Sequence, residues 1–312
     1  TLFPYTTLFR SGSCQSRRLC REHVQRIKRS QKKRPMPELP EVETFVKSLT
    51  SGGMTGSPIL NRPILFASLY WEKTLAAQDA GDFTAWFVGK SVAEVTRRGK
   101  YLMLRIDDRF LLIHLRMSGD LRTVPATGAI GRHDRFSLTF VDGERLVFRD
   151  PRKFGRIWLT QGPETILAKL GVEPLSGALT ADYLRVGFTK SARPVKSLLL
   201  DQGFIAGLGN IYTDEALFRA GIHPQTPANR VAGLGIERIE ALRRAIQDTL
   251  SEGIRRNGAS FDWVYRGGDF QNYFSVYGKK GESCPRCGAE IERIVVGQRG
   301  THFCPRCQPP LI

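Results

Sequence analysis

The chain has few of the residues that mark secreted or membrane proteins. Only six cysteines occur among its 312 residues, and four of them stand in two Cys-x-x-Cys pairs. That usage favours a metal site in a reducing compartment over a disulfide framework. No apolar run approaches the roughly 20 residues of a membrane-spanning helix; the run 110–113 ends at His114. We therefore expect neither a disulfide-stapled secreted domain nor a membrane segment.

Acidic residues are also scarce, since 30 Asp and Glu stand against 47 Lys and Arg, a net charge of +17. The excess is uneven: residues 1–35 hold ten Lys and Arg and one Glu (+9), and residues 36–312 carry the remaining +8. A basic body of this size suits a polyanionic partner, although a solvated basic surface is the plain alternative. With 41% hydrophobic and 25% charged residues, the chain is globular, and its length suits two modest domains.

The first 35 residues do not resemble part of a folded enzyme. Residues 1–11 resemble the in-frame translation of a common sequencing adaptor, and residues 17–34 are basic without apolar periodicity. An Arg-rich targeting peptide is the alternative. We expect an artefactual or disordered extension and exclude it from the fold prediction.

The sequence predicts an α+β protein. Between residues 59 and 159, short apolar or alternating runs separated by turn residues favour an antiparallel β-sandwich, and from Ala181 the apolar period becomes helical. The predicted strands are 64–66, 101–106, 110–115, 136–140 and 146–148, and the predicted helices begin after Pro40 and cover 197–200, 210–219 and 236–250. The predicted domains are 36–165 (sandwich with a flanking helix), 166–178 (linker), 179–275 (helical) and 276–312 (zinc hairpin).

The two cysteine pairs predict a zinc site. Cys284 and Cys287 are separated by sixteen residues from Cys304 and Cys307. Two such knuckles on a hairpin can converge as a tetrahedral site of four thiolates. Because four thiolates leave no coordination position open, we expect one structural Zn²⁺ rather than a catalytic one.

The stretch 36–44, Met-Pro-Glu-Leu-Pro-Glu-Val-Glu-Thr, has the pattern of a translation start inside the longer sequence. Removal of Met36 would leave Pro37 with a free secondary amine, which can attack an electrophilic sugar carbon and form an iminium. Glu38 beside it can transfer protons, and Glu41 lies one helical turn further on. With the extension attached, the nitrogen of Pro37 is an amide and cannot be a nucleophile.

A structural interpretation of the same stretch is open on spacing alone. Pro40 suits the first turn of a helix and Glu41 suits its dipole. Val42, Phe45 and Leu49 then form one apolar face.

Further motifs stand along the chain in a fixed order. A glycine-rich turn at 207–209 opens a predicted helix at Asn210, an arrangement that presents free backbone N–H groups to an anion. Lys100 lies in a predicted hairpin turn, and Arg299 lies at the tip of the predicted zinc hairpin. On sequence alone, each of these residues also fits an ordinary turn or helix start.

Taken together, these motifs resemble the bacterial formamidopyrimidine-DNA glycosylases over residues 36–308. The resemblance implies a bifunctional enzyme that excises oxidised purines such as 8-oxoguanine and then cleaves the strand by β,δ-elimination. It implies a helix–two-turn–helix motif in the helical domain. It implies catalytic roles for Pro37 as nucleophile, Glu38 as proton donor, Lys100 and Arg299.

The same resemblance implies the residues that contact DNA. Met117, Arg152 and Phe154 would fill the gap left by the extruded base. His133, Lys196 and Asn210 would contact the DNA backbone. The sequence departs from the family at Ala192, where a basic residue is common, and residues 260–270 form a shorter segment than usual, which leaves the lesion preference open.

Two alternatives remain at this stage. One is the sister glycosylase of oxidised pyrimidines, which Leu39 and the set Met117, Arg152 and Phe154 disfavour; the other is a non-catalytic zinc-ribbon DNA-binding protein. We expect a monomer in the bacterial cytoplasm whose partner is damaged double-stranded DNA.

Overall fold

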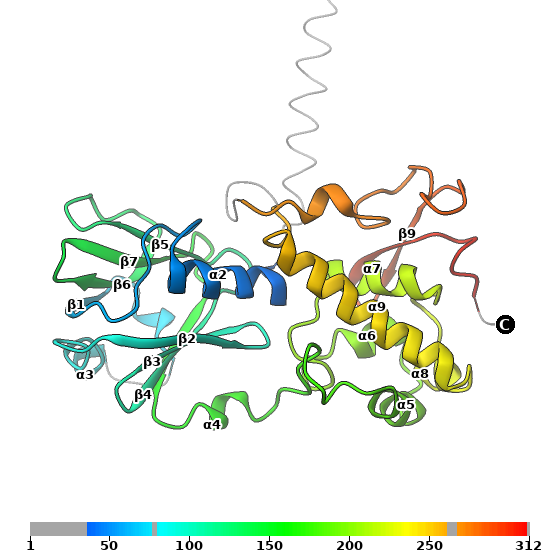
Figure 1. Cartoon of the computed structure of the whole chain (residues 1–312), viewed down its shortest axis with the longest axis horizontal. Coiled ribbons are helices and arrows are strands. Elements are labelled where there is room, and N and C mark those ends of the chain that lie inside the picture. Colours follow the sequence, from blue (N-terminus) through cyan, green and yellow to red (C-terminus); the bar gives the residue numbers. More distant parts are fainter. Residues whose placement is uncertain (1–35, 77–79, 261–266, 311–312) are drawn as a thin grey trace, which may run out of the picture. The chain divides into compact units, whose positions relative to one another are not determined.

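Two four-stranded antiparallel sheets form the first half of the described chain in the computed structural model, which describes residues 36–76, 80–260 and 267–310. One sheet has the order β1-β6-β7-β5 and the other β2-β3-β4-β8 (Figure 1). The strands are β1 (Ile64–Leu69), β2 (Val92–Arg98), β3 (Tyr101–Ile106), β4 (Arg109–His114), β5 (Asp120–Pro125), β6 (Asp134–Phe140), β7 (Glu144–Arg149) and β8 (Arg156–Thr160). Short helices η1 (Glu72–Thr74), α3 (Ala80–Ala85) and α4 (Glu164–Leu167) flank them.

The sandwich confirms the predicted fold class but contains three strands that the sequence analysis missed. Strand β2 does not alternate regularly, because only Val92 and Val95 are buried and three of its seven residues are charged. Strands β5 and β8 mix apolar with polar residues. Tertiary pairing rather than local pattern creates these strands, since each is held in register by a neighbour.

The second half of the chain is helical and ends in a hairpin. Its helices are α5 (Ala181–Thr189), α6 (Val195–Leu199), α7 (Asn210–Ala220), α8 (Ala228–Ala232), α9 (Ile236–Arg255) and η2 (Phe270–Tyr273). Helix α7 ends at Gly221, whose φ of 66° is the left-handed conformation that glycine adopts without strain. Strands β9 (Glu292–Val296) and β10 (Arg299–Phe303) form the hairpin. Among the described residues, no helix is long and apolar enough to span a membrane.

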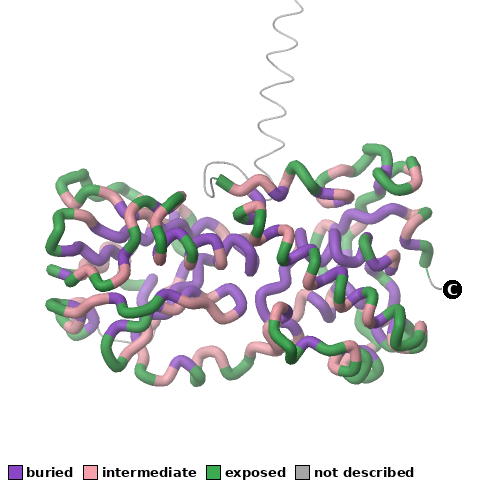
Figure 2. Tube along the Cα trace, viewed as in Figure 1, coloured by how far each residue is buried: buried purple, intermediate pink, exposed green. Residues whose placement is uncertain are grey.

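Helix α2 (Leu39–Ser51) connects two separate hydrophobic cores. Val42, Phe45 and Leu49 point into the core between the sheets, whereas Leu39 belongs to the core built around α7 and α9. The helix accordingly packs against both β2 and α9 (Figure 1), and most of its residues are buried (Figure 2). Replacing a fully buried leucine such as Leu39 with Ala costs about 2–5 kcal/mol.

An ion-pair network joins the hairpin of β2 and β3 to the segment before α5. Arg97 pairs with Glu43 of α2 (2.6 Å) and with Glu173 (2.7 Å), and Arg98 pairs with the same Glu173 (2.9 Å). Glu173 also accepts the backbone N–H of Gly99 (2.5 Å). Burial raises the pKa of Glu173, but the two arginines and the N–H outweigh it and lower that pKa overall.

We predict that Glu173→Gln destabilises the protein by about 1–3 kcal/mol, because Arg98 loses its carboxylate partner and Arg97 keeps only Glu43. Since the folded-state pKa of Glu173 is lowered, its contribution is present above its unfolded pKa near 4.5 and is lost as the pH falls. Chemical denaturation at pH 7 and pH 4 should show a difference between variant and wild type that shrinks at the lower pH.

The matched control is Glu94→Gln, which removes an exposed pair with Arg105. That change should cost no more than about 1 kcal/mol. Equal losses of unfolding free energy in the two variants at pH 7 would contradict the stabilising effect assigned to the Glu173 ion pairs.

Candidate functional site

The carboxylate of Glu38 lies buried at the first turn of helix α7. It accepts the backbone N–H of Ile211 (3.0 Å) and more weakly that of Tyr212 (3.5 Å), and 3% of the residue is exposed. Free N–H groups at a helix N-terminus favour an anion. The approach requires glycine at 209, because a Cβ there would lie 2.1 Å from the carboxyl carbon of Glu38.

Burial raises the pKa of Glu38 to about 7. The positive charge of Lys100 opposes the shift, as do the two N–H groups of α7, while Glu41 adds to it. A carboxyl group with this pKa exists in both protonation states near neutral pH, as general acid–base catalysis requires.

Glu41, in the first turn of α2, fixes the position of Glu38 just before that helix. Its carboxylate accepts the backbone N–H of Glu38 (2.9 Å), the hydroxyl of Tyr212 (2.8 Å) and the N–H of Ala259 (2.7 Å). Burial raises the pKa of Glu41, and these hydrogen bonds oppose the shift. Sequence analysis placed Glu41 near the site but did not identify this function; the three-residue spacing from Glu38, typical of a capping box, was the available signal.

Two of the predicted catalytic residues lie beside this carboxylate. Pro37 directly precedes Glu38 and is buried. Lys100, in the turn between β2 and β3, is 5% exposed. Burial lowers the pKa of Lys100, whereas Glu38 and Glu41 raise it. The structure thus brings Pro37, Glu38 and Lys100 together from two distant parts of the sequence.

Arg299 opens strand β10 and is exposed. The preceding turn is tight, with positive φ at Gly297 (53°) and Gln298 (61°). The positive charge of Arg299 helps to lower the pKa of both Lys100 and Lys196, so its guanidinium lies near these two lysines. The amide nitrogen of Asn210 donates to the carbonyl of Gly300 (2.9 Å), which ties the hairpin to the start of α7.

Lys196 lies inside the protein rather than on its surface. Its ammonium group donates to Asp214 (2.5 Å), to the hydroxyl of Thr301 (2.8 Å) and to the carbonyl of Gly300 (3.3 Å), and none of its side chain is exposed. The predicted direct contact between Lys196 and DNA does not fit this placement, because its three donors already have protein acceptors. The side chain instead anchors the Arg299 hairpin to α7.

A second group of predicted residues gathers on two loops of the sandwich. Met117 is half-buried after β4, and Phe154 before β8 is 48% exposed. The guanidinium of Arg152 lies 4.8 Å from the centre of the Phe154 ring. His133 is half-buried, and its backbone carbonyl accepts the N–H of Asp150 next to these loops (2.9 Å).

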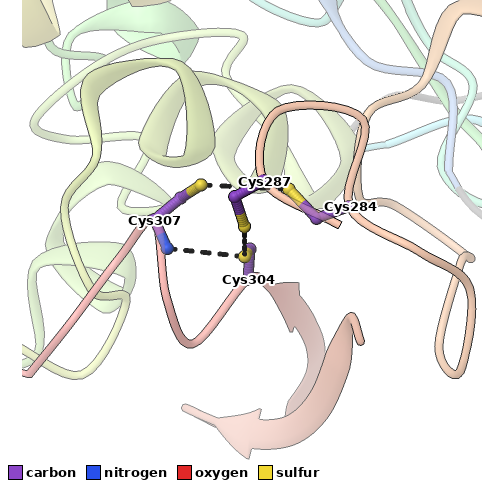
Figure 3. A group of neighbouring side chains, drawn as sticks. All are labelled: Cys284, Cys287, Cys304 and Cys307. Atoms are coloured by element: carbon purple, nitrogen blue, oxygen red, sulfur yellow. Dashed lines mark hydrogen bonds between the residues drawn. The ribbon is translucent and has the colours of Figure 1, made fainter. Parts of the chain in front are cut away.

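The four cysteines converge as the spacing predicts (Figure 3). Their sulfur atoms all lie within 4.8 Å of one another, with 3.9 Å between Cys284 and Cys307 and 3.5 Å between Cys287 and Cys304. A tetrahedral ion with Zn–S bonds of about 2.3 Å places its sulfurs about 3.8 Å apart, so the cluster fits Zn²⁺. Four thiolates confirm a structural zinc site.

Sequence profiles of known families match most of the chain. The formamidopyrimidine-DNA glycosylase N-terminal domain matches residues 36–157, and the H2TH domain of the same glycosylases matches residues 170–263. A zinc finger found in FPG and IleRS matches residues 281–310.

Curated relatives and solved structures agree with these profiles. The chain is 41% identical to formamidopyrimidine-DNA glycosylase from Halalkalibacterium halodurans, over 88% of this chain and 100% of the relative. It is 44% identical to that from Chloroflexus aurantiacus, over 88% and 98%. The Lactococcus lactis Fpg in complex with DNA containing an abasic site matches with a TM-score of 0.79 at 36% identity, over 87% of this chain and 99% of that one.

We predict that Cys304→Ser lowers bound zinc from about one ion per chain to near zero, because a metal held by four thiolates loses one ligand. The β9–β10 hairpin should lose protection from amide hydrogen exchange while the sandwich stays protected. Metal analysis and exchange mass spectrometry provide the measurements, with Cys20→Ser as a control outside the two pairs. A full zinc content in Cys304→Ser would contradict the assignment.

Proposed function

Because the chain belongs to the formamidopyrimidine-DNA glycosylase family, it is a DNA glycosylase of base excision repair, and we propose that Pro37 and Glu38 carry out its chemistry. The observation that carries the proposal is the buried Glu38, with a pKa of about 7, directly beside Pro37. We further propose oxidised purines as substrates, in keeping with the names of the relatives. Those names leave no support for a non-catalytic zinc-ribbon protein.

The first step requires the damaged nucleotide outside the duplex, because its glycosidic bond is inaccessible within the base stack. The lone pair of the Pro37 nitrogen then forms a bond to C1′ while the bond from C1′ to the base breaks; the departing base takes up a proton, and the nitrogen gives up the proton it carried. Protonated Glu38 donates to the ring oxygen O4′ as the bond from C1′ to O4′ breaks, and the nitrogen lone pair forms the second bond to C1′. The product is an iminium between Pro37 and the sugar.

Strand cleavage follows from the iminium. Loss of a C2′ proton expels the 3′ phosphate, and a second elimination expels the 5′ phosphate. Arg299, exposed at the tip of the zinc hairpin, would hold a phosphate at the lesion. Lys100 would contribute its positive charge, which stabilises the ionised form of Glu38.

The two sandwich loops would occupy the space left by the flipped nucleotide. Met117 would enter the gap, Arg152 would pair with the orphaned base, and Phe154 would wedge the stack. His133 and Asn210 would contact the DNA backbone. The exposed ring of Phe154 supports this role, since a large apolar side chain at the surface favours a partner.

We also propose the predicted domain boundaries of 36–165, 166–178, 179–275 and 276–312. The profile matches at 36–157, 170–263 and 281–310 support the three-part division, although the second match begins inside the proposed linker. The boundary of the extension, residues 1–35, falls outside the described residues. The predicted cytoplasmic location, with the bacterial chromosome, rests on the DNA substrate and on thiolates that need a reducing compartment.

The general experiment is reduction by borohydride in the presence of duplex DNA containing 8-oxoguanine. An iminium enzyme becomes covalently linked to the DNA, and peptide mapping should place the link on Pro37. Excision without any trapped complex would overturn the proposed Schiff-base chemistry.

We predict that single-turnover base excision falls as the pH rises above about 7, because Glu38 must be protonated to act as donor and its raised pKa of about 7 sets the midpoint. The rate should drop about tenfold per pH unit beyond that midpoint. Glu38→Gln should excise slowly and lose this limb of the profile. If the excision rate of Glu38→Gln fell in the same way above pH 7, the titration would belong to another group.

A further prediction concerns the attachment of residues 1–35. In the 312-residue chain, the nitrogen of Pro37 is acylated by Met36, so its lone pair is delocalised and no iminium can form. That chain should bind damaged duplex but not excise 8-oxoguanine. A chain that begins at Met36 and loses this Met should excise the base and be trapped through Pro37. Equal excision by the two forms, with the extension still attached by mass spectrometry, would rule out Pro37 as the nucleophile.

A further inference from the structure

The two loops that carry the proposed gap-filling residues run side by side. One comprises residues 115–119 between β4 and β5, and the other residues 150–155 between β7 and β8. Strand pairing fixes both ends, since His114 pairs with Arg156 and Asp120 pairs with Arg149. Each loop therefore crosses from one sheet to the other at the same edge of the sandwich.

Two fully buried polar residues join these loops. The hydroxyl of Ser118 donates to a carboxylate oxygen of Asp150, and neither residue has any exposed surface. Ser118 directly follows Met117. Asp150 opens the loop that carries Arg152 and Phe154.

Asp150 also organises the backbone of its own loop. Its carboxylate accepts the N–H of Arg152 (3.1 Å) and that of Gly155 (2.7 Å), on the two sides of Phe154. The N–H of Arg152 also lies 3.3 Å from the Ser118 hydroxyl oxygen. The same small group of atoms thus sets the direction of the backbone at Met117, Arg152 and Phe154.

Both loops hold a non-glycine residue in the left-handed region, Arg116 with φ of 54° and Lys153 with φ of 61°. Such conformations cost about 1–3 kcal/mol each and persist only where the surroundings impose them. Ser118 lies two residues after Arg116, and the carbonyl of Asp150 accepts the N–H of Lys153 (3.3 Å). A carboxylate that accepts from several buried donors is an effective constraint, because moving the carboxylate away would leave those donors without a hydrogen-bond partner.

We propose that Ser118 and Asp150 are positioning residues that make the two loops enter the DNA as one unit. The inference rests on the proposed gap-filling function of Met117 and Phe154. Neither Ser118 nor Asp150 reaches the surface, so both act through the loop backbone and touch no DNA themselves. The gap is then filled in one concerted step rather than by two independent insertions.

A double-mutant cycle on single-turnover excision of 8-oxoguanine tests the inference. Met117→Ala and Phe154→Ala should each slow excision, and the double variant should depart from the product of the two effects by about fivefold to tenfold. In a Ser118→Ala background this coupling should shrink to about twofold or less. Asp150→Asn should shrink it as well, because an amide cannot accept from all three donors.

Ser137→Ala is the matched control. Ser137 is also fully buried and makes a side-chain hydrogen bond, to the hydroxyl of Tyr70 (2.9 Å), but it lies in β6 away from both loops. This variant should leave the coupling unchanged. Rates are normalised to folded protein, so a loss of stability alone does not alter the coupling factor.

The outcomes separate the inference from the proposed function. If both single variants slow excision but their coupling survives the loss of the Ser118 hydroxyl, the link is refuted and the gap-filling function stands. If neither Met117→Ala nor Phe154→Ala slows excision, the gap-filling function fails and the inference fails with it. Loss of coupling in Ser118→Ala and not in Ser137→Ala supports the link.

Discussion

The burial of Glu38 against the N-terminus of α7 is the contact on which the rest of the structure depends. It brings residue 38 to residues 211 and 212, and Leu39 beside it enters the helical core while Val42 and Phe45 enter the sandwich. In the unfolded chain, water would form hydrogen bonds to the carboxylate as these N–H groups do. The buried contact therefore persists only because both cores hold α2 in place. The raised pKa of Glu38 follows from the same burial. Fold and chemistry are thus consequences of one packing arrangement.

Local sequence was sufficient where a function depends on spacing along the chain. The zinc site follows from two Cys-x-x-Cys pairs, because each knuckle is a local turn and only their convergence requires the fold. The start of α2 was likewise visible from Pro40 and Glu41. The predicted fold class is confirmed, although β2, β5 and β8 were missed because their pairing partners, not their own patterns, create them.

Residue functions that depend on distant partners were not accessible from sequence. Lys196 has the pattern of a surface cation, and only the fold shows Asp214 and Thr301 around its ammonium group. Glu41 similarly acquires its three donors from residues 38, 212 and 259. The sequence alone does not show whether a charged side chain will contact water, DNA or another side chain, because tertiary packing decides among these partners.

The all-thiolate site gives the molecule a dependence on redox state. Thiolates are the protein groups most readily converted to sulfenic acid or disulfide, and either change removes a zinc ligand. The hairpin that the ion stabilises carries Arg299, and it shares Gly300 and Thr301 with the buried Lys196. Oxidant stress severe enough to strip the zinc would therefore unfold the hairpin that carries Arg299. The conditions that oxidise guanine in DNA would then also limit the supply of competent enzyme, so zinc and reduced thiols become part of the cell's capacity for repair.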